Sequence, residues 1–205
     1  MSSTHRTDDA QSMTSLAETF EHGLSYAEMV SGAAKNADLF AITRRSAAAP
    51  EAHAARIAAT GRTWHLLSIS EDWCGDSVNT LPWVDALAAC APNLDHRIIR
   101  RDEHVDLMDR HLTNGRTRSI PIVLLLDERY VERAWWGPRT TQLQAWFEGA
   151  ESQAMSKEEQ YKVLRTRTVR DRGRSILEEI TAMIEETARQ DEVGASVVAT
   201  PQAAS

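Results

Sequence analysis

The chain is poor in cysteine: its 205 residues include only two, Cys74 and Cys90, and they form no Cys-x-x-Cys pair. This scarcity excludes a two-cysteine redox loop, and the seven histidines show no recognised metal-ligand spacing. Long apolar runs are also absent, since no segment reaches the roughly 18 to 20 residues that span a bilayer. Residues 1–13 lack the apolar stretch of a signal peptide. We therefore expect a cytoplasmic protein in a reducing location, with no membrane partner and no metal site.

Lysine is scarce as well, and the overall charge is negative: 30 acidic residues outweigh 23 basic ones, which gives a net charge of -7. Proteins that bind nucleic acid generally present an excess of Lys and Arg to phosphate, so this balance argues against a nucleic-acid partner. One segment departs from the balance, namely Arg165, Arg167, Arg170, Arg172 and Arg174. Two interpretations stay open for it: a solvated helix face paired with Asp and Glu, or a patch that binds an anion or a partner.

A predicted strand and a predicted helix surround Cys74. Residues 64–69 form an apolar run typical of a buried strand, and residues 77–90 place apolar side chains at helical spacing. Cys74 therefore lies at or just before a helix N-terminus, where unpaired N–H groups and the helix dipole favour a thiolate. Nearby negative charge opposes that effect, from Glu71, Asp72 and Asp76. The sequence leaves open which effect decides the pKa of Cys74.

Cys90 lies sixteen residues after Cys74, near the far end of the same predicted helix. At about 1.5 Å per residue the two cysteines are roughly 20 Å apart, whereas a disulfide tolerates only about 7 Å between Cα atoms. We therefore expect Cys90 to be a small buried apolar side chain rather than a partner of Cys74.

The rest of the pattern alternates strands and helices. Strands are predicted at 95–100, 120–126 and 130–135, and helices at 105–112 and 140–148, which gives the order β-α-β-α-β-β-α. The apolar stretches at 98–99 and 122–126 suit central strands covered on both faces. We expect an α/β fold in a single domain at 15–190, with a helical extension at 15–60, a core at 63–148, C-terminal helices at 152–189 and disordered tails at 1–14 and 190–205.

Four spaced landmarks carry a family resemblance. Trp73-Cys74-Gly75-Asp76-Ser77 is a WCxxS sequence between a strand and a helix, Pro82 follows the cysteine by eight residues, Ile120-Pro121 opens a strand, and Gly137 lies sixteen residues after that proline. This pattern resembles the thioredoxin superfamily, and over about 63–147 it is similar to a bacterial branch with no firmly assigned role. The resemblance implies a mixed central sheet flanked by helices, here with extra N-terminal and C-terminal helices. It also implies a cis peptide bond at Ile120-Pro121 that faces the Cys74 sulfur.

The same resemblance implies thiol-disulfide exchange through Cys74. Ser77 stands where a second cysteine would resolve a mixed disulfide, so an external thiol must do so, and Ser77 can at most donate a hydrogen bond to the sulfur. Ser68 stands where thioredoxins carry a buried acidic residue, which weakens the case for full reductase activity. The expected partners are protein or small-molecule thiols and disulfides. We assign catalytic roles to Cys74, Ser77 and Pro121 and substrate contacts to Trp73, Gly75, Asp76 and Ile120.

Other interpretations compete with this one. Cys74-Gly75-Asp76-Ser77 also resembles the site of one-thiol glutaredoxins, which share an iron-sulfur cluster with glutathione. The segment 136–139 reads Trp-Gly-Pro-Arg instead of their glycine pair, so we expect no cofactor. A second alternative is a non-catalytic interaction module that holds a peptide between Trp73 and Pro121. The segment Arg100-Arg101-Asp102 either lines that site or forms an ordinary ion pair. The oligomeric state stays open.

Overall fold

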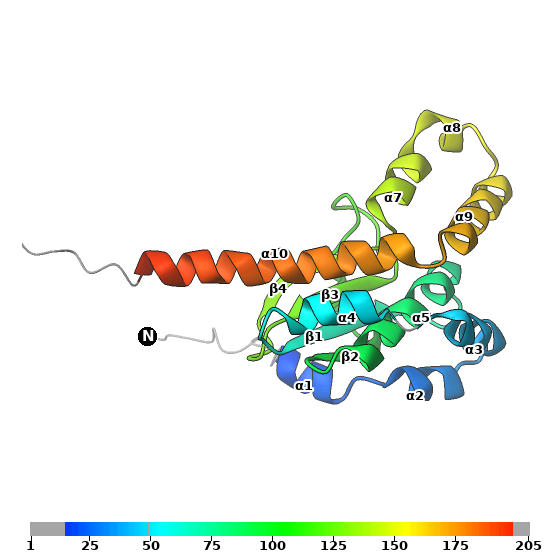
Figure 1. Ribbon diagram of the computed structural model, residues 1–205. Helices are drawn as coiled ribbons and strands as arrows, with labels where there is room; N and C mark the ends of the chain where they lie inside the picture. Colours follow the sequence, from blue (N-terminus) through cyan, green and yellow to red (C-terminus); the bar gives the residue numbers. More distant parts are fainter. Residues whose placement is uncertain (1–14, 49, 199–205) are drawn as a thin grey trace, which may run out of the picture.

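The computed structural model describes residues 15–48 and 50–198, with side chains described as far as Val193. At its centre lies a four-stranded sheet in the order β2-β1-β3-β4, in which β2 is parallel to β1 while β3 and β4 are antiparallel to their neighbours (Figure 1). The strands are β1 (Trp64–Ser70), β2 (Leu94–Arg100), β3 (Ile122–Leu126) and β4 (Glu132–Trp136). The mixed sheet agrees with the expected fold class.

The two central strands are covered by helices on both faces; β3 is entirely apolar, whereas β1 carries His65, Ser68 and Ser70 among its apolar residues. All residues of β1 and β3 are buried. The prediction that Ile98-Ile99 belongs to a central strand was wrong, since β2 is an edge strand. Both isoleucines are nevertheless buried, and an antiparallel bridge between Leu24 and Ile98 covers the open side of β2. That cover explains why an edge strand has the sequence of a central one.

Helices pack on both faces of the sheet (Figure 1). On one face, α4 (Glu51–Ala58), α5 (Gly75–Cys90) and α10 (Arg174–Val198) bury their apolar side chains against β1, β3 and β4. On the other face, α1 (Leu16–Glu21) and α6 (Val105–Asp109) pack against β1 and β3, and Phe20 of α1 lies against His65 at the start of β1, the end of the sheet away from Cys74. Next to β2, α2 (Tyr26–Ser31) and α3 (Ala37–Ser46) pack against α5.

Three helices form an arm that extends away from the sheet: α7 (Thr141–Glu148), α8 (Ala150–Gln153) and α9 (Lys157–Asp171) (Figure 1). The chain then turns back into α10 through Arg172 and Gly173, which have φ values of 55° and 72°. Gly173 is required here, because a Cβ on it would overlap the indole ring of Trp83 on α5. This close approach fixes where the arm joins the core.

The helix boundaries follow from local sequence. Ser15, Ser25 and Ser156 each begin a helix with a reciprocal capping box to a glutamate three residues later. Helices were expected to end by 189, but α10 continues to Val198. The predicted tail at 1–14 lies outside the described residues. Within the described part of the chain, no helix is both long and apolar enough to cross a bilayer.

Candidate functional site

Cys74 lies at the junction between β1 and α5. It is the N-cap residue of α5, with an extended backbone, and its side chain is buried with only 9% of the residue exposed. The thiol donates a hydrogen bond to the carbonyl oxygen of Ile120, with an Sγ to O distance of 3.3 Å. The following Ile120-Pro121 peptide bond is cis, as the resemblance implied. Three of the predicted site residues, Cys74, Ile120 and Pro121, therefore meet at one point.

The acidic residues before Cys74 turn away from the sulfur to hold the loop in place. One carboxylate oxygen of Glu71 accepts the N–H of Asp102 at 3.1 Å, next to β2. The carboxylate of Asp72 accepts the N–H of Ala34 at 2.7 Å, in the connection between α2 and α3. These two carboxylates anchor the loop to the N-terminal extension and to β2. Of the three acidic neighbours expected to raise the pKa of Cys74, Asp76 is the one whose charge does so.

Burial decides the pKa of Cys74. Removal of the side chain from water raises the pKa above the usual range of a thiol. Hydrogen bonding from the Ser77 hydroxyl and from the Ser77 N–H lowers it, the charge of Asp76 raises it, and the Asp76 N–H lowers it. The helix N-terminus therefore lowers the pKa of Cys74, as predicted, but burial raises the pKa by more. At neutral pH the stable form of Cys74 is the thiol, which agrees with the hydrogen bond it donates to Ile120.

Ser77 lies one helical turn into α5, directly behind the thiol. It is fully buried, and its hydroxyl accepts a hydrogen bond of 2.8 Å from the hydroxyl of Ser70, the last residue of β1. That bond leaves the Ser77 proton free to point at Cys74, and it ties the strand to the helix beneath the sulfur. Ser77 thus holds the position of a second thiol without its chemistry.

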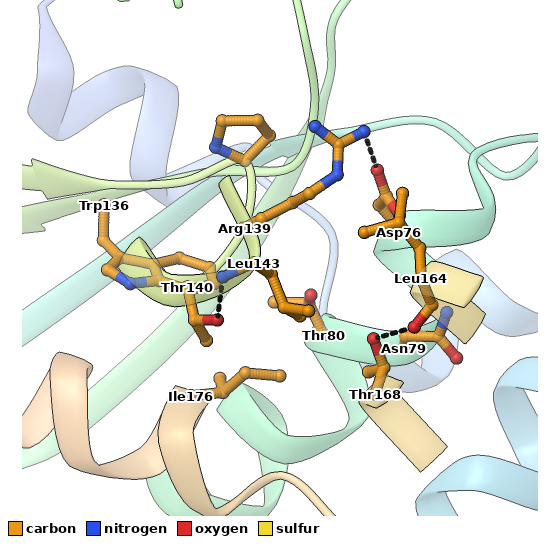
Figure 2. A pocket seen from close by; sticks show the side chains of 11 residues that line it. Asp76, Asn79, Thr80, Trp136, Arg139, Thr140, Leu143, Leu164, Thr168 and Ile176 are labelled. Carbon is orange, nitrogen blue, oxygen red and sulfur yellow. Dashed lines mark hydrogen bonds and ion pairs between the residues drawn. The ribbon is translucent and has the colours of Figure 1, made fainter. Parts of the chain in front are cut away.

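Asp76 forms an ion pair with Arg139, at 2.6 Å between Oδ2 and Nη2 (Figure 2). Both side chains are largely buried, and burial raises the pKa of Asp76 while the guanidinium lowers it. Arg139 lies just after β4, and its guanidinium also bonds Gln144 at 3.1 Å and stacks over Phe147. Asp76 therefore faces the start of the arm, where it joins α5 to α7, and it is not free to contact a substrate in this arrangement.

The comparison with protein families decides where the chain belongs. The family model described as thioredoxin matches residues 23–157, which is more than half of the chain. The chain belongs to the thioredoxin family. Thioredoxin-family membership agrees with the mixed sheet and with a cysteine at the N-terminus of the first helix that follows the central strand.

Solved structures similar to this thioredoxin-family chain add no function. A protein of unknown function from Pseudomonas aeruginosa is 25% identical, with a TM-score of 0.65 over 85% of this chain and 99% of that one. An HIV epitope scaffold is 24% identical, with a TM-score of 0.63 over 84% of this chain and 98% of that one. No curated protein matches the sequence. The comparisons therefore establish the family and the fold.

The outer surface of this thioredoxin-family site carries an exposed aromatic ring. Trp73 is 43% exposed, so its ring is available at the surface and does not pack in the core. The guanidinium of Arg101 lies 4.8 Å from the centre of the Trp73 ring and also pairs with Asp102 at 2.8 Å. Arg101 thus both lines the site and forms an ion pair. Gly75 is exposed, and a Cβ there would meet open space.

The position of the usual buried acid is filled by a neutral pair. Ser68 on β1 and His96 on β2 are both buried, and the Ser68 hydroxyl lies 2.9 Å from Nε2 of His96. Burial lowers the pKa of His96 to about 4, so the ring is neutral at pH 7. Among the described residues, no group of three or more His, Cys, Asp and Glu side chains is placed to hold a metal ion.

Sequence reasoning missed two residues that shape this site, Arg139 and Ser70. Arg139 is separated from Asp76 by several strands and helices, so no local spacing points to their ion pair. Ser70 carried a weaker signal, because a serine at the end of an apolar strand needs a buried hydrogen-bond partner. Cys90 is free and half-buried at the margin of the core, somewhat more exposed than predicted.

Proposed function

We propose that this thioredoxin-family protein exchanges thiols and disulfides through Cys74 alone. The observation that carries the proposal is the convergence of the Cys74 thiol, the α5 N-terminus and the Ile120-Pro121 segment within hydrogen-bonding distance. Backbone N–H groups at the helix end stabilise a thiolate once the proton has left. The chemistry belongs in a reducing compartment such as the cytoplasm, where external thiols are abundant.

The exchange has two balanced steps. The Cys74 thiolate attacks one sulfur of a substrate disulfide, a new S–S bond forms, and the second sulfur leaves as a thiolate. An external thiolate then attacks the substrate sulfur of the mixed disulfide, forms a disulfide with it and releases the Cys74 thiolate. Ser77 takes no covalent part, because its oxygen cannot replace a sulfur nucleophile. Its hydroxyl helps to stabilise the departing Cys74 thiolate.

A second candidate is a non-catalytic binding module, and the state of Cys74 favours it. The thiol is 9% exposed and its raised pKa keeps it protonated near neutral pH, both of which slow attack on a disulfide. Trp73, by contrast, is exposed beside Arg101 and offers a ring for a peptide to pack on. The two candidates differ in one measurable quantity, which is the reactivity of the Cys74 sulfur.

The deciding experiment measures mixed-disulfide formation with 2-hydroxyethyl disulfide by intact-protein mass spectrometry. A Cys90→Ser background is used because Cys90 is only half-buried and free. The proposal expects one adduct per chain that maps to Cys74, is lost in Cys74→Ser, and is released by added thiol. Its rate is expected to rise with pH beyond the range in which an ordinary thiol has already ionised. Absence of an adduct in the folded protein even at alkaline pH would assign the site to the binding module.

A further inference from the structure

The five arginines between 165 and 174 make no ion pair in the described part of the chain. Arg167 stacks over the ring of Trp146 at 4.4 Å, and Nε of Arg174 donates to the backbone carbonyl of Asp171. The interpretation of a solvated helix face paired with Asp and Glu is therefore wrong in its pairing, although all five side chains are exposed to solvent. On a chain with a net charge of -7, a local run of unpaired cations is a feature that requires its own explanation.

Three of these arginines line one hollow, which we call the arginine pocket. Arg167 and Arg170 come from the end of α9 and Arg174 from the start of α10, while the first turn of α7 closes the other side. The hollow has a volume of 330 Å³, and its polar lining includes Thr140, Gln142 and Ser175. This volume lies at the small end of ligand pockets, which suits a compact molecule.

The charge balance of the arginine pocket favours an anion with two charges. Its lining residues include three arginines, all exposed to solvent, and one acidic residue, Asp171, so two positive charges are in excess. Asp171 is already engaged, because its two oxygens accept the N–H and the hydroxyl of Ser175 at 2.9 and 2.8 Å. A phosphate monoester carries about -1.5 to -2 charges at pH 7 and matches the excess. Arginine forks also suit the geometry of phosphate oxygens.

The backbone around the arginine pocket is fixed before any ligand arrives. Gly173 packs against Trp83 and sets the turn between α9 and α10, while Asp171 caps the first turn of α10. Arg167 and Arg170 are three residues apart on α9 and so project from one face of that helix. The pocket also shares buried Thr140 and half-buried Leu143 with the small cavity that Arg139 and Asp76 line (Figure 2).

We propose that the arginine pocket binds a small phosphate-bearing molecule. This inference does not depend on the reactivity of Cys74, and it stands or falls separately from the proposed exchange reaction. Inorganic phosphate and a phosphate ester share the chemistry that the pocket recognises. The test therefore uses both as probes, inorganic phosphate and glycerol 3-phosphate, together with pyrophosphate as a more highly charged anion.

The test is isothermal titration calorimetry of the full chain with each probe, at constant ionic strength set with sodium chloride. We expect saturable binding at one site per chain, and at least about tenfold weaker binding in Arg170→Ala, since a charge-assisted hydrogen bond contributes that much. Arg165→Ala is the matched control: it removes the same charge from an exposed, unpaired arginine on the same helix that does not line the pocket. Its affinity is expected to stay within about twofold of the unmodified chain.

Two results would overturn the proposal. The first is the absence of saturable binding by all three probes, which would leave the pocket with solvent ions only. The second is an equal loss in Arg165→Ala and Arg170→Ala, which would show that the probes respond to net charge. Circular dichroism of both variants checks that they remain folded, and Arg170→Lys, which keeps the charge, is expected to retain part of the affinity. Binding of only one of the two phosphate probes also supports the site. Binding of glycerol 3-phosphate identifies the ligand as a phosphate ester, and binding of inorganic phosphate identifies it as free phosphate.

Discussion

Gly137 lies directly against the carbonyl oxygen of Pro121. Its φ is 129°, a value that L side chains rarely adopt, and a Cβ added there would come closer than 3.0 Å to that oxygen. Because the oxygen belongs to the backbone, it cannot rotate away as a flexible side chain would. The end of β4 therefore packs against the Ile120-Pro121 segment, whose Ile120 carbonyl oxygen accepts a hydrogen bond from the Cys74 thiol.

This contact predicts that Gly137→Ala is strongly destabilising. We expect the free energy of unfolding to fall by more than about 3 kcal/mol, from the overlap and the strained φ together. Gly61→Ala is the control, since Gly61 has a φ of 66° but open space around it, and it should cost only about 1 kcal/mol. Urea denaturation followed by tryptophan fluorescence measures both. Equal losses of unfolding free energy in the two variants would mean that the close contact with the Pro121 carbonyl oxygen does not contribute to the effect.

Ser77→Ala is expected to make Cys74 less reactive. The substitution removes the hydroxyl that lowers the pKa of Cys74, so a smaller fraction of thiolate is present at pH 7. One lost hydrogen bond to a charged group slows alkylation by iodoacetamide about tenfold. Ser70→Ala is the matched control, because it removes the Ser70 to Ser77 bond but leaves the Ser77 hydroxyl in place. A tenfold loss in Ser70→Ala as well would assign the effect to packing.

Asp76→Asn is expected to have the opposite effect on Cys74. Removal of the carboxylate takes away a negative charge that raises the pKa of Cys74 and leaves the Arg139 cation unpaired, so alkylation at pH 7 becomes several-fold faster. The same change lowers the free energy of unfolding by about 3 kcal/mol, because a largely buried guanidinium loses its partner. Asp38→Asn, an exposed change of equal charge on α3, serves as the reference. Unchanged alkylation in Asp76→Asn would contradict the electrostatic coupling.

Ser77→Cys tests whether the site retains the geometry of a two-cysteine enzyme. The introduced thiol stands behind Cys74, at a position from which the serine hydroxyl already influences the sulfur. We expect it to form a disulfide with Cys74 under mild oxidation, seen as a loss of two hydrogens by mass spectrometry, and to give measurable reduction of insulin with dithiothreitol. The same variant carrying Cys74→Ser is the control and should do neither. If the Ser77→Cys variant stays reduced under mild oxidation, the loop no longer permits a disulfide between positions 74 and 77.

Local sequence patterns predicted the part of the fold that surrounds Cys74. The apolar run of β1 and the helical spacing of α5 are both short-range signals, and each is strong enough to place the cysteine at a helix N-terminus. The landmarks Pro121 and Gly137 came from family resemblance, and the contact between them gives a physical reason for their spacing in this chain. The strand and the helix could be predicted because they depend on residues close together in the sequence. Pro121 and Gly137 could be predicted because their backbone packing is common to the fold.

The electrostatics of the site could not be predicted in the same way. The burial of Cys74 depends on how Ile120 packs over it, and the orientation of Asp72 depends on Ala34, which lies in the N-terminal extension. Sequence proximity placed Glu71 and Asp72 near the sulfur, whereas their hydrogen bonds point them elsewhere. The pairing of Asp76 with Arg139 is likewise a tertiary contact. Charge near a residue in sequence is thus a poor guide to charge near it in space.

His96 makes the stability of the fold sensitive to acid. Burial lowers its pKa to about 4, with Asp85 and Asp95 raising it and Arg97 lowering it, while an unfolded chain binds the proton near pH 6.5. The unfolded state therefore binds more protons between these values, and stability falls as the pH drops from 6.5 to 4, by at most roughly 3 kcal/mol. His96→Gln cannot titrate but can still bond to Ser68, so its unfolding free energy, measured in urea, should depend less on pH over this interval. Parallel pH profiles for the two proteins would contradict the neutral His96 and Ser68 pair.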